Sequence, residues 1–136
     1  MGEFYAEAGF AFDAVAAEKA FRDLIEHPDW GAAWLATSPE NAAGYVVFTL
    51  GFSMQYGGRD GWVEDVYVRP PFRSHHLGRQ LLETLAEHAA RDDARAVHLA
   101  VAPANADAQS LYELLGWRVQ ELNLLTRLLP SRANAA

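Results

Sequence analysis

Five basic side chains gather between positions 69 and 79 of the sequence: Arg69, Arg73, His75, His76 and Arg79. They lie where a β-type run, residues 63–68, gives way to an amphipathic helical pattern that begins near Ser74. The first amides of a helix have no intrahelical acceptor, and the helix dipole adds partial positive charge there. This arrangement predicts a phosphate-binding site. The alternative interpretation is a solvated basic surface that balances acidic neighbours.

Gly78 favours the phosphate site. Inside the first turn of a helix, glycine costs about 1 kcal/mol relative to alanine. A missing side chain is most easily explained there if a ligand must approach the backbone closely. The sequence contains neither G-x-x-x-x-G-K-[ST] nor G-x-G-x-x-G after a strand, which excludes the Walker-type and dinucleotide-binding loops.

A tyrosine and two carboxylates are further candidates. Tyr112 flanks the apolar side of a short predicted helix, so its ring can be half-buried with the hydroxyl in a cleft, although an ordinary core tyrosine fits the same pattern. Because side chains alternate along a strand, Glu64 and Asp65 are expected to face opposite sides of the sheet. Trp62 and Tyr56 are candidates for the border of a cationic-amine site.

The pattern of elements predicts how these residues are positioned. Asp13 is expected to cap a helix that ends at Pro28, and a strand follows at residues 32–36. Two further strands, residues 44–55 and 63–68, should form an antiparallel hairpin around a glycine-rich turn. A helix over residues 74–91 then connects to a parallel strand by a right-handed crossover. The remaining predicted elements are a strand at 96–102, a helix at 107–115 stopped by Gly116, and a last strand pair at 117–121 and 124–129.

Composition limits the possible functions. The chain has 136 residues, 51% of them hydrophobic, which predicts one domain over residues 1–130 and a flexible tail at 131–136. The absence of cysteine excludes disulfides and thiolate chemistry, and the histidines are not spaced as metal ligands. A net charge of -7 argues against nucleic acid as a partner. With no apolar run of about 20 residues and no signal peptide, we expect a cytoplasmic protein that does not enter the membrane.

Two motifs in order resemble the Gcn5-related N-acetyltransferase (GNAT) family. The first, Arg73-Ser74-His75-His76-Leu77-Gly78, is similar to the family's R/Q-x-x-G-x-G/A loop for the pyrophosphate of acetyl-CoA, with His76 at the place of the first glycine. The second runs from Asn105 to Trp117 and matches N-x-x-A-x-x-[LF]-Y-x-x-x-G-[FW] in full. The resemblance covers roughly residues 44–129. Because the loop binds through backbone amides, a His76 side chain that points away is compatible with it, and a protonated imidazole could add to the binding.

The resemblance implies a mixed α/β fold, with a mostly antiparallel sheet, helices on both faces and a strand–helix–strand site for acetyl-CoA as co-substrate. The family's first strand has no counterpart in this sequence, and a homodimer could cover the exposed sheet edge. The strand that precedes the loop should bind the pantetheine arm through its backbone. The implied cofactor-binding residues are Val66, Tyr67, Val68, Arg73, Ser74, His75, His76, Leu77, Gly78, Arg79, Asn105 and Ser110.

By the same resemblance, Tyr112 protonates the departing thiolate and Glu64 is the base that activates the amine, with Asp65 or a water chain as alternatives. The expected reaction is acetyl transfer to a primary amine of a small molecule, such as a polyamine, an amino acid or an aminoglycoside. Transfer should be direct in a ternary complex, since no cysteine can carry the acetyl group. Two alternatives are acetylation of protein lysines or N-termini, and a non-catalytic acyl-CoA-binding module.

Overall fold

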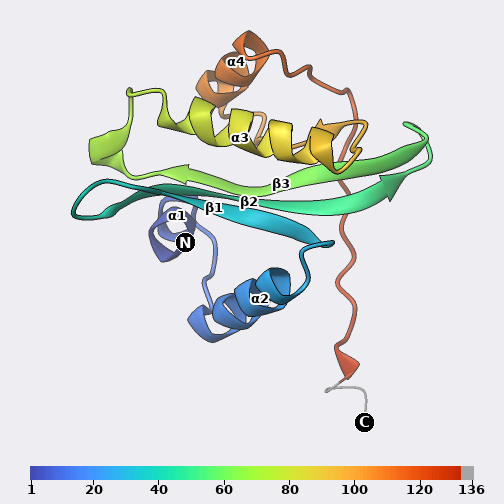
Figure 1. Cartoon of the computed structure of the whole chain (residues 1–136), viewed down its shortest axis with the longest axis horizontal. Helices are drawn as coiled ribbons and strands as arrows, with labels where there is room; N and C mark the ends of the chain where they lie inside the picture. Colours follow the sequence, from blue (N-terminus) through green and yellow to red (C-terminus); the bar gives the residue numbers. More distant parts are fainter. Residues whose placement is uncertain (133–136) are drawn as a thin grey trace. The chain divides into compact units, whose positions relative to one another are not determined.

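Four strands form one sheet, in the order β1-β2-β3-β4, in the computed structural model of residues 1–132 (Figure 1). The chain divides into two units, Met1–Ala100 and Val101–Ala136, and the sheet lies in the first. The elements of the first unit are α1 (Gly2–Ala8), α2 (Ala14–Glu26), β1 (Gly31–Thr37), β2 (Ala42–Ser53), β3 (Gly58–Val68), the 3₁₀ turn η1 (Pro70–Phe72), α3 (Leu77–Arg91) and β4 (Val97–His98).

The sheet is mixed and mostly antiparallel, as predicted. β1 pairs with β2 and β2 with β3 in antiparallel register, whereas β3 and β4 are parallel and joined through α3. β4 is shorter than the strand predicted at residues 96–102. It pairs with β3 only at Gly61 with Val97 and Trp62 with His98, and the two strands separate beyond these pairs.

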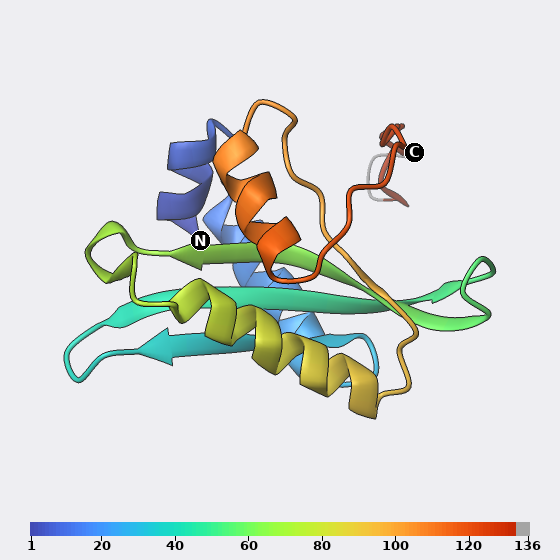
Figure 2. The ribbon, with the colours of Figure 1, turned by 90° about the horizontal axis from the view of Figure 1, so that it is seen from above.

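Helices cover both faces of this sheet. α3 crosses one face, and α1 and α2 lie on the other (Figure 1). Figure 2, the view from above, shows that α3 runs along the strands. The core beneath α3 is built on Val46, Phe48 and Leu85, which are fully buried. The Phe48 ring occupies the space beside Gly61, where an added Cβ would lie 2.0 Å from Phe48 Cε2. Glycine is therefore required at this point of β3.

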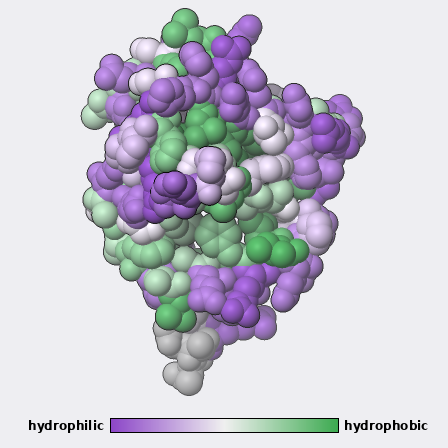
Figure 3. Space-filling view, turned by 60° about the vertical axis from the view of Figure 1, so that its left-hand side comes forward, coloured by the Kyte–Doolittle hydropathy of each residue, from purple (hydrophilic) through white to green (hydrophobic). Residues whose placement is uncertain are grey.

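The N-terminal helices pack less tightly. Asp13 caps α2 as predicted, because its carboxylate accepts hydrogen bonds from the Val15 and Ala16 amides at 3.0 and 3.1 Å. No residue of α2 is fully buried, and Ile25 is largely exposed. Apolar side chains also show between polar ones on the surface drawn in Figure 3.

The second unit contains α4 (Ala106–Leu114), which begins at the Asn105 cap and is followed by Gly116 at φ 94°, as expected for a helix stop. The strand pair predicted at 117–121 and 124–129 is wrong, because neither segment is a strand in the part of the chain that the structure describes. The apolar pattern is present, but a strand requires a pairing partner. Residues 133–136 of the expected tail lie outside the described residues. No helix within residues 1–132 has the length and apolar character to span a bilayer.

Candidate functional site

A β-bulge in β3 places two carboxylates on one face of the sheet. Val47 of β2 pairs with Asp65 and the next residue, Phe48, pairs with Val63, so Glu64 is the extra residue in the ladder. Thr49 donates a 2.7 Å hydrogen bond to Glu64, and Tyr45 donates one of 3.0 Å to Asp65.

Tyr45 and Thr49 are four residues apart on β2 and therefore share a face. The prediction that Glu64 and Asp65 face opposite sides is wrong, because the bulge interrupts the alternation on which it depends. Both carboxylates lie on the side of the sheet that α1 and α2 cover. Sequence reasoning missed Tyr45 and Thr49, since no residue pattern in β2 indicated a bulge in its neighbour.

The two carboxylates differ in their surroundings. Glu64 is exposed, whereas Asp65 is 7% exposed. Burial raises the pKa of Asp65, and the nearby charge of Glu64 acts in the same direction, while the hydrogen bond from Tyr45 opposes them. Burial and the Asp65 charge also raise the pKa of Tyr45, so its hydroxyl remains a donor. Asp65 is therefore easier to protonate than an ordinary aspartate.

Two cavities are lined by Tyr45, the hydrogen-bond partner of Asp65, although neither Glu64 nor Asp65 lines them. The larger has a volume of about 340 Å³ and is bordered by Glu3 of α1, Tyr67 of β3 and Arg69, which follows β3, among others. The smaller, about 250 Å³, is bordered by apolar side chains such as Phe21 and Leu35. The face that carries the carboxylates is therefore hollowed on a scale that suits a small molecule.

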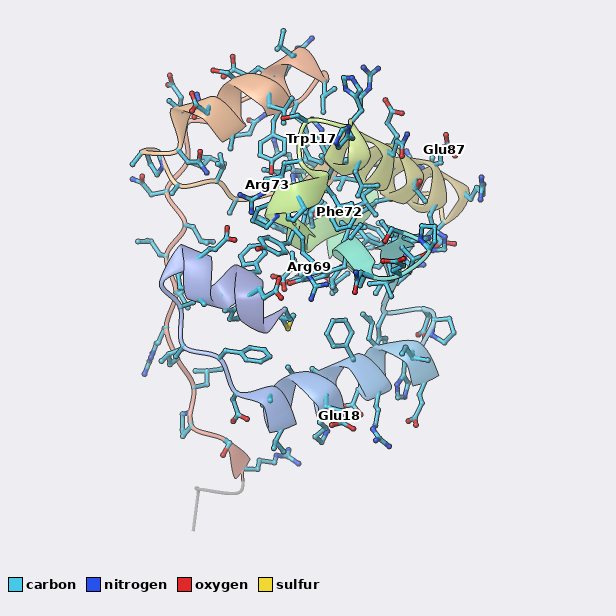
Figure 4. The ribbon with its side chains drawn as sticks, turned by 90° about the vertical axis from the view of Figure 1, so that its left-hand side faces the viewer. Glu18, Arg69, Phe72, Arg73, Glu87 and Trp117 are labelled. Atoms are coloured by element: carbon cyan, nitrogen blue, oxygen red, sulfur yellow. The ribbon has the colours of Figure 1, made fainter. Side chains whose placement is uncertain are left out.

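Two arginines of the basic cluster are engaged by α1. The Arg69 guanidinium donates to both carboxylate oxygens of Glu3, at 3.0 and 2.9 Å. Arg73 donates to Glu7 at 2.8 Å and to the Val68 carbonyl at 2.8 Å. Figure 4 shows both arginines on the side of the sheet where α1 lies. For these two side chains, the interpretation as a basic surface paired with acidic neighbours fits better than direct phosphate binding.

Arg79 is also paired, with Glu83 one turn along α3 at 2.8 Å. What remains of the predicted anion site is the backbone at the start of α3, with the exposed His75 and His76 beside it. No side chain caps this helix, so the amides of its first turn keep their hydrogen-bonding capacity.

α3 begins at Leu77, three residues later than predicted, because Ser74 and His76 adopt left-handed backbone conformations with φ of 69° and 60°. Glycine takes this conformation without steric cost, whereas other residues lose about 1–2 kcal/mol. The left-handed backbone explains why a glycine suits the position of His76 and shows that histidine can follow the same path.

Gly78 lies in the first turn of α3. A Cβ added there would meet only Val68 Cγ2, at 3.8 Å, which is ordinary van der Waals contact. The packing of the described residues thus does not require glycine, in contrast to Gly61. The space over Gly78 is consistent with the close ligand approach expected from the sequence.

The backbone of β3 offers hydrogen-bonding groups at its free edge. Arg69 N donates to Ala43 O on β2 at 2.8 Å, so by alternation Tyr67 also bonds toward β2. Val66 and Val68 point the other way, where no described strand pairs with β3 beyond Trp62. Of the three residues predicted to bind pantetheine, Val66 and Val68 therefore face this free edge and Tyr67 does not. The Val68 carbonyl already accepts from Arg73.

The second unit carries the remaining predicted residues. Burial raises the pKa of Tyr112, so its hydroxyl stays protonated at neutral pH, and its ring centroid lies 6.3 Å from that of Trp117. Asn105 accepts a hydrogen bond from the Ala108 amide at 3.2 Å as the cap of α4, and Ser110 is exposed. Within residues 1–132, no cluster of three potential ligands could hold a metal ion.

The chain belongs to the acetyltransferase (GNAT) family, whose model matches residues 2–117. The fold agrees with this assignment. An integron cassette protein from the mobile metagenome of Cole Harbour Salt Marsh, HFX_CASS3, superposes with a TM-score of 0.82 and 37% identity, over 95% of this chain and 80% of that one. AAC(6')-Iy, in complex with the bisubstrate analog CoA-S-monomethyl-acetylneamine, shares the fold at a TM-score of 0.78 and 17% identity, over 88% and 83% of the two chains.

Sequence relatives are found among thialysine N-epsilon-acetyltransferases. The enzyme of Bos taurus is 33% identical over 73 residues, which is 54% of this chain and 42% of its own length. The enzyme of Mus musculus is 30% identical over 90 residues, 62% of this chain and 52% of its own length. The chain thus spans about half the length of the curated relatives it matches.

Proposed function

We propose that this protein transfers an acetyl group from acetyl-CoA to a primary amine of a small molecule. The observation that carries the proposal is the separation of β3 from β4 after Trp62, beside the uncapped start of α3. An extended thioester could lie along the edge that β3 leaves free, with its phosphates at the helix amides. The carboxylates of Glu64 and Asp65 lie on the α1/α2 face of the same strand, where they would attract a cationic amine.

On the donor side, the backbone groups of Val66 and Val68 would pair with the pantetheine arm. The amides of Leu77, Gly78 and Arg79 would hold the pyrophosphate, with His75 and His76 near it. Arg73 would act indirectly, because its guanidinium ties Val68 to Glu7. The space at Gly78 supports this assignment, since among the described residues only Val68 Cγ2 comes within 4 Å of a Cβ built there.

On the acceptor side, the site must bind an ammonium group and deprotonate it. At neutral pH an amine of pKa about 10.4 loses its proton at a cost of about 4.6 kcal/mol, so a base is needed. Glu64, which is exposed and positioned by Thr49, takes this proton directly or through water. Asp65 adds negative charge next to it, and a cavity of about 340 Å³ lined by Tyr45, the hydrogen-bond partner of Asp65, is of a size for a small acceptor.

Tyr112 would protonate the thiolate that leaves after the amine has attacked. Because burial raises the pKa of this tyrosine, the hydroxyl is protonated at neutral pH and can donate its proton as the C–S bond breaks. Direct transfer follows from the lack of cysteine, since no thiol can carry the acetyl group. The similarity to thialysine N-epsilon-acetyltransferases supports an amine acceptor, although it covers only part of those proteins.

Calorimetry with CoA and acetyl-CoA tests the donor, and thiol release over a panel of amines tests the reaction. The panel should contain thialysine, a polyamine, an aminoglycoside and a lysine-containing peptide. We expect binding of both CoA forms and turnover with at least one of the small amines. Absence of CoA binding contradicts the proposal at its first step. Turnover with the peptide alone would favour a protein acetyltransferase, and binding without any turnover a non-catalytic module.

A further inference from the structure

A carboxylate–imidazole pair joins β4 to β3, the strand that carries Glu64. His98 Nε2 of β4 is 3.1 Å from Asp60 Oδ2 of β3, and both side chains are largely buried, with 23% and 12% of their surfaces exposed. Gly51 leaves room for the carboxylate, because a Cβ at that position would lie 2.9 Å from Asp60 Oδ1. The proposed donor and acceptor sites make no use of this pair.

His98 lies on the same face of the sheet as Glu64, the proposed base for the amine. His98 is the register partner of Trp62, at the last pair before β3 and β4 separate. Trp62 pairs with Thr49, which bonds Glu64, so Asp60, Trp62 and Glu64 share the face that α1 and α2 cover. The imidazole thus lies two residues along the strand from Glu64, at the point where the strands diverge.

Aromatic rings hold this imidazole in place. The ring centroid of Trp62 is 5.1 Å from that of His98, and the centroid of Tyr56 is 5.6 Å away. With Nε2 directed at Asp60, the orientation of the ring is defined by three neighbours. A carboxylate at one ring nitrogen fixes the tautomer and stabilises the imidazolium that forms when the other nitrogen takes a proton. This arrangement fits a proton acceptor better than a side chain that only fills space.

The proposed reaction requires more than one proton acceptor. An ammonium group has three protons and the amide product has one, so two protons leave the same nitrogen in each turnover. The N–C bond forms and the C–S bond breaks, and the sulfur receives one proton from Tyr112. Glu64 can take the first proton, from the ammonium. It cannot hold a second one while the tetrahedral adduct of the amine and the thioester collapses. A second base near Glu64 would remove the proton that the nitrogen loses as the N–C bond forms.

We propose that His98, oriented by Asp60, is this second base. His98 and Glu64 then each pass their proton to solvent and Tyr112 takes one back, so that each turnover releases one proton in total. An imidazole is suited to the task because its ordinary pKa is the closest of all side chains to neutral pH. The inference rests on the proposed acetyl transfer, and on the placement of the Asp60–His98 pair where β3 leaves β4.

The test compares His98→Gln and Asp60→Asn with a matched control, Asp92→Asn. Asp92 forms a similar pair with His88, at 3.3 Å, but the pair belongs to α3 and its C-terminus. We expect kcat of His98→Gln to fall by about 10²-fold, in the range of general-base catalysis, with the Kd of acetyl-CoA and the KM of the amine within about threefold. Asp60→Asn should lose about tenfold in kcat because the base is less well oriented, and Asp92→Asn should equal the wild type.

Added imidazole separates a chemical role from a structural one. It should restore part of the turnover of His98→Gln, whereas it cannot repair a distorted strand. If His98→Gln fails to fold, the kcat of Asp60→Asn relative to that of Asp92→Asn tests the inference instead. If the wild type acetylates an amine and both His98→Gln and Asp60→Asn keep the wild-type kcat, the role of His98 is overturned and the proposed function is not. A wild type that acetylates no amine overturns the proposed function, and the inference with it.

Discussion

The hydroxyl of Tyr45 donates a 3.0 Å hydrogen bond to the buried carboxylate of Asp65, on the same face of the sheet as Glu64. Burial raises the pKa of Asp65 above its value in the unfolded chain, about 3.9. A raised folded-state pKa favours the folded protein at low pH, and this contribution is lost as the pH rises through the folded value.

Asp65→Asn should therefore change the dependence of stability on pH. We expect the variant to gain in unfolding free energy relative to the wild type as the pH rises from about 4, until Asp65 is fully ionised. Asparagine can still accept the hydrogen bond from Tyr45, so the packing is preserved. Denaturant unfolding at a series of pH values measures the difference. A difference that stays constant over this range would show that Asp65 ionises normally.

Gly78→Ala should separate folding from donor binding. The added methyl meets only Val68 at ordinary contact distance, so the unfolding free energy should stay the same or rise by up to about 1 kcal/mol through helix propensity. The Kd of acetyl-CoA should rise by about tenfold, which corresponds to about 1.4 kcal/mol, because the methyl lies where the ligand approaches the backbone. Calorimetry gives both quantities, and unchanged affinity would place the pyrophosphate elsewhere.

The left-handed conformation of His76 predicts an order of stability for two variants. His76→Gly should be more stable than His76→Ala by about 1 kcal/mol, since alanine keeps the steric cost and glycine removes it. Their affinities for acetyl-CoA should be similar if the loop binds through backbone amides. A much weaker affinity of both variants than of the wild type would instead assign the His76 imidazole a direct contact.

Tyr112→Phe should lower kcat by about 10²-fold if the hydroxyl protonates the thiolate. The ring stays in place, so the Kd of CoA should be within about threefold of the wild-type value. Because burial raises the pKa of Tyr112, wild-type turnover should show no loss from ionisation of this tyrosine at mildly alkaline pH. Thiol release measures kcat and its dependence on pH, and unchanged turnover in the variant would exclude the acid role.

The contact between α1 and the end of β3 should depend on pH. Hydrogen bonds from Tyr67 and Arg73 lower the pKa of Glu7, so the stabilisation is present above the unfolded value, about 4.3, and is lost as the pH falls through the lowered folded value. Glu7→Gln should be less stable than the wild type at neutral pH and equal to it in acid. Thermal unfolding at neutral and at acidic pH, with Glu18→Gln on α2 as a control, measures the effect.

Much of the fold could be predicted from sequence because it follows from local signals. Asp13 identified the start of α2, Gly116 the end of α4, and the glycine-rich turn the β2–β3 hairpin. The final strand pair could not be predicted correctly, because pairing depends on a partner and not on the alternation of residues 117–129. The shortness of β4 likewise reflects its separation from β3, which no residue of β4 indicates.

The predicted donor residues remain predictions, but those that depend on the backbone agree with the geometry. Val66 and Val68 face the edge of β3 that has no described strand partner beyond Trp62. The side-chain assignments were less accurate, since they depend on neighbours far apart in sequence. Arg73 was expected at the phosphates, but Glu7 of α1 engages it. Regular alternation along a strand predicted that Asp65 and Glu64 face opposite sides of the sheet, but the bulge interrupts this alternation.

The early separation of β3 from β4 has a consequence for the dynamics of the sheet. The amides of Val66 and Val68 lie inside a core strand but at an edge without a described strand partner, so in the free protein they should exchange with deuterium far faster than the β2-facing amide of Tyr67. A bound donor that pairs with this edge would slow their exchange and leave that of Tyr67 nearly unchanged. In this respect acetyl-CoA would serve as an additional strand, which the sheet holds only during the catalytic cycle.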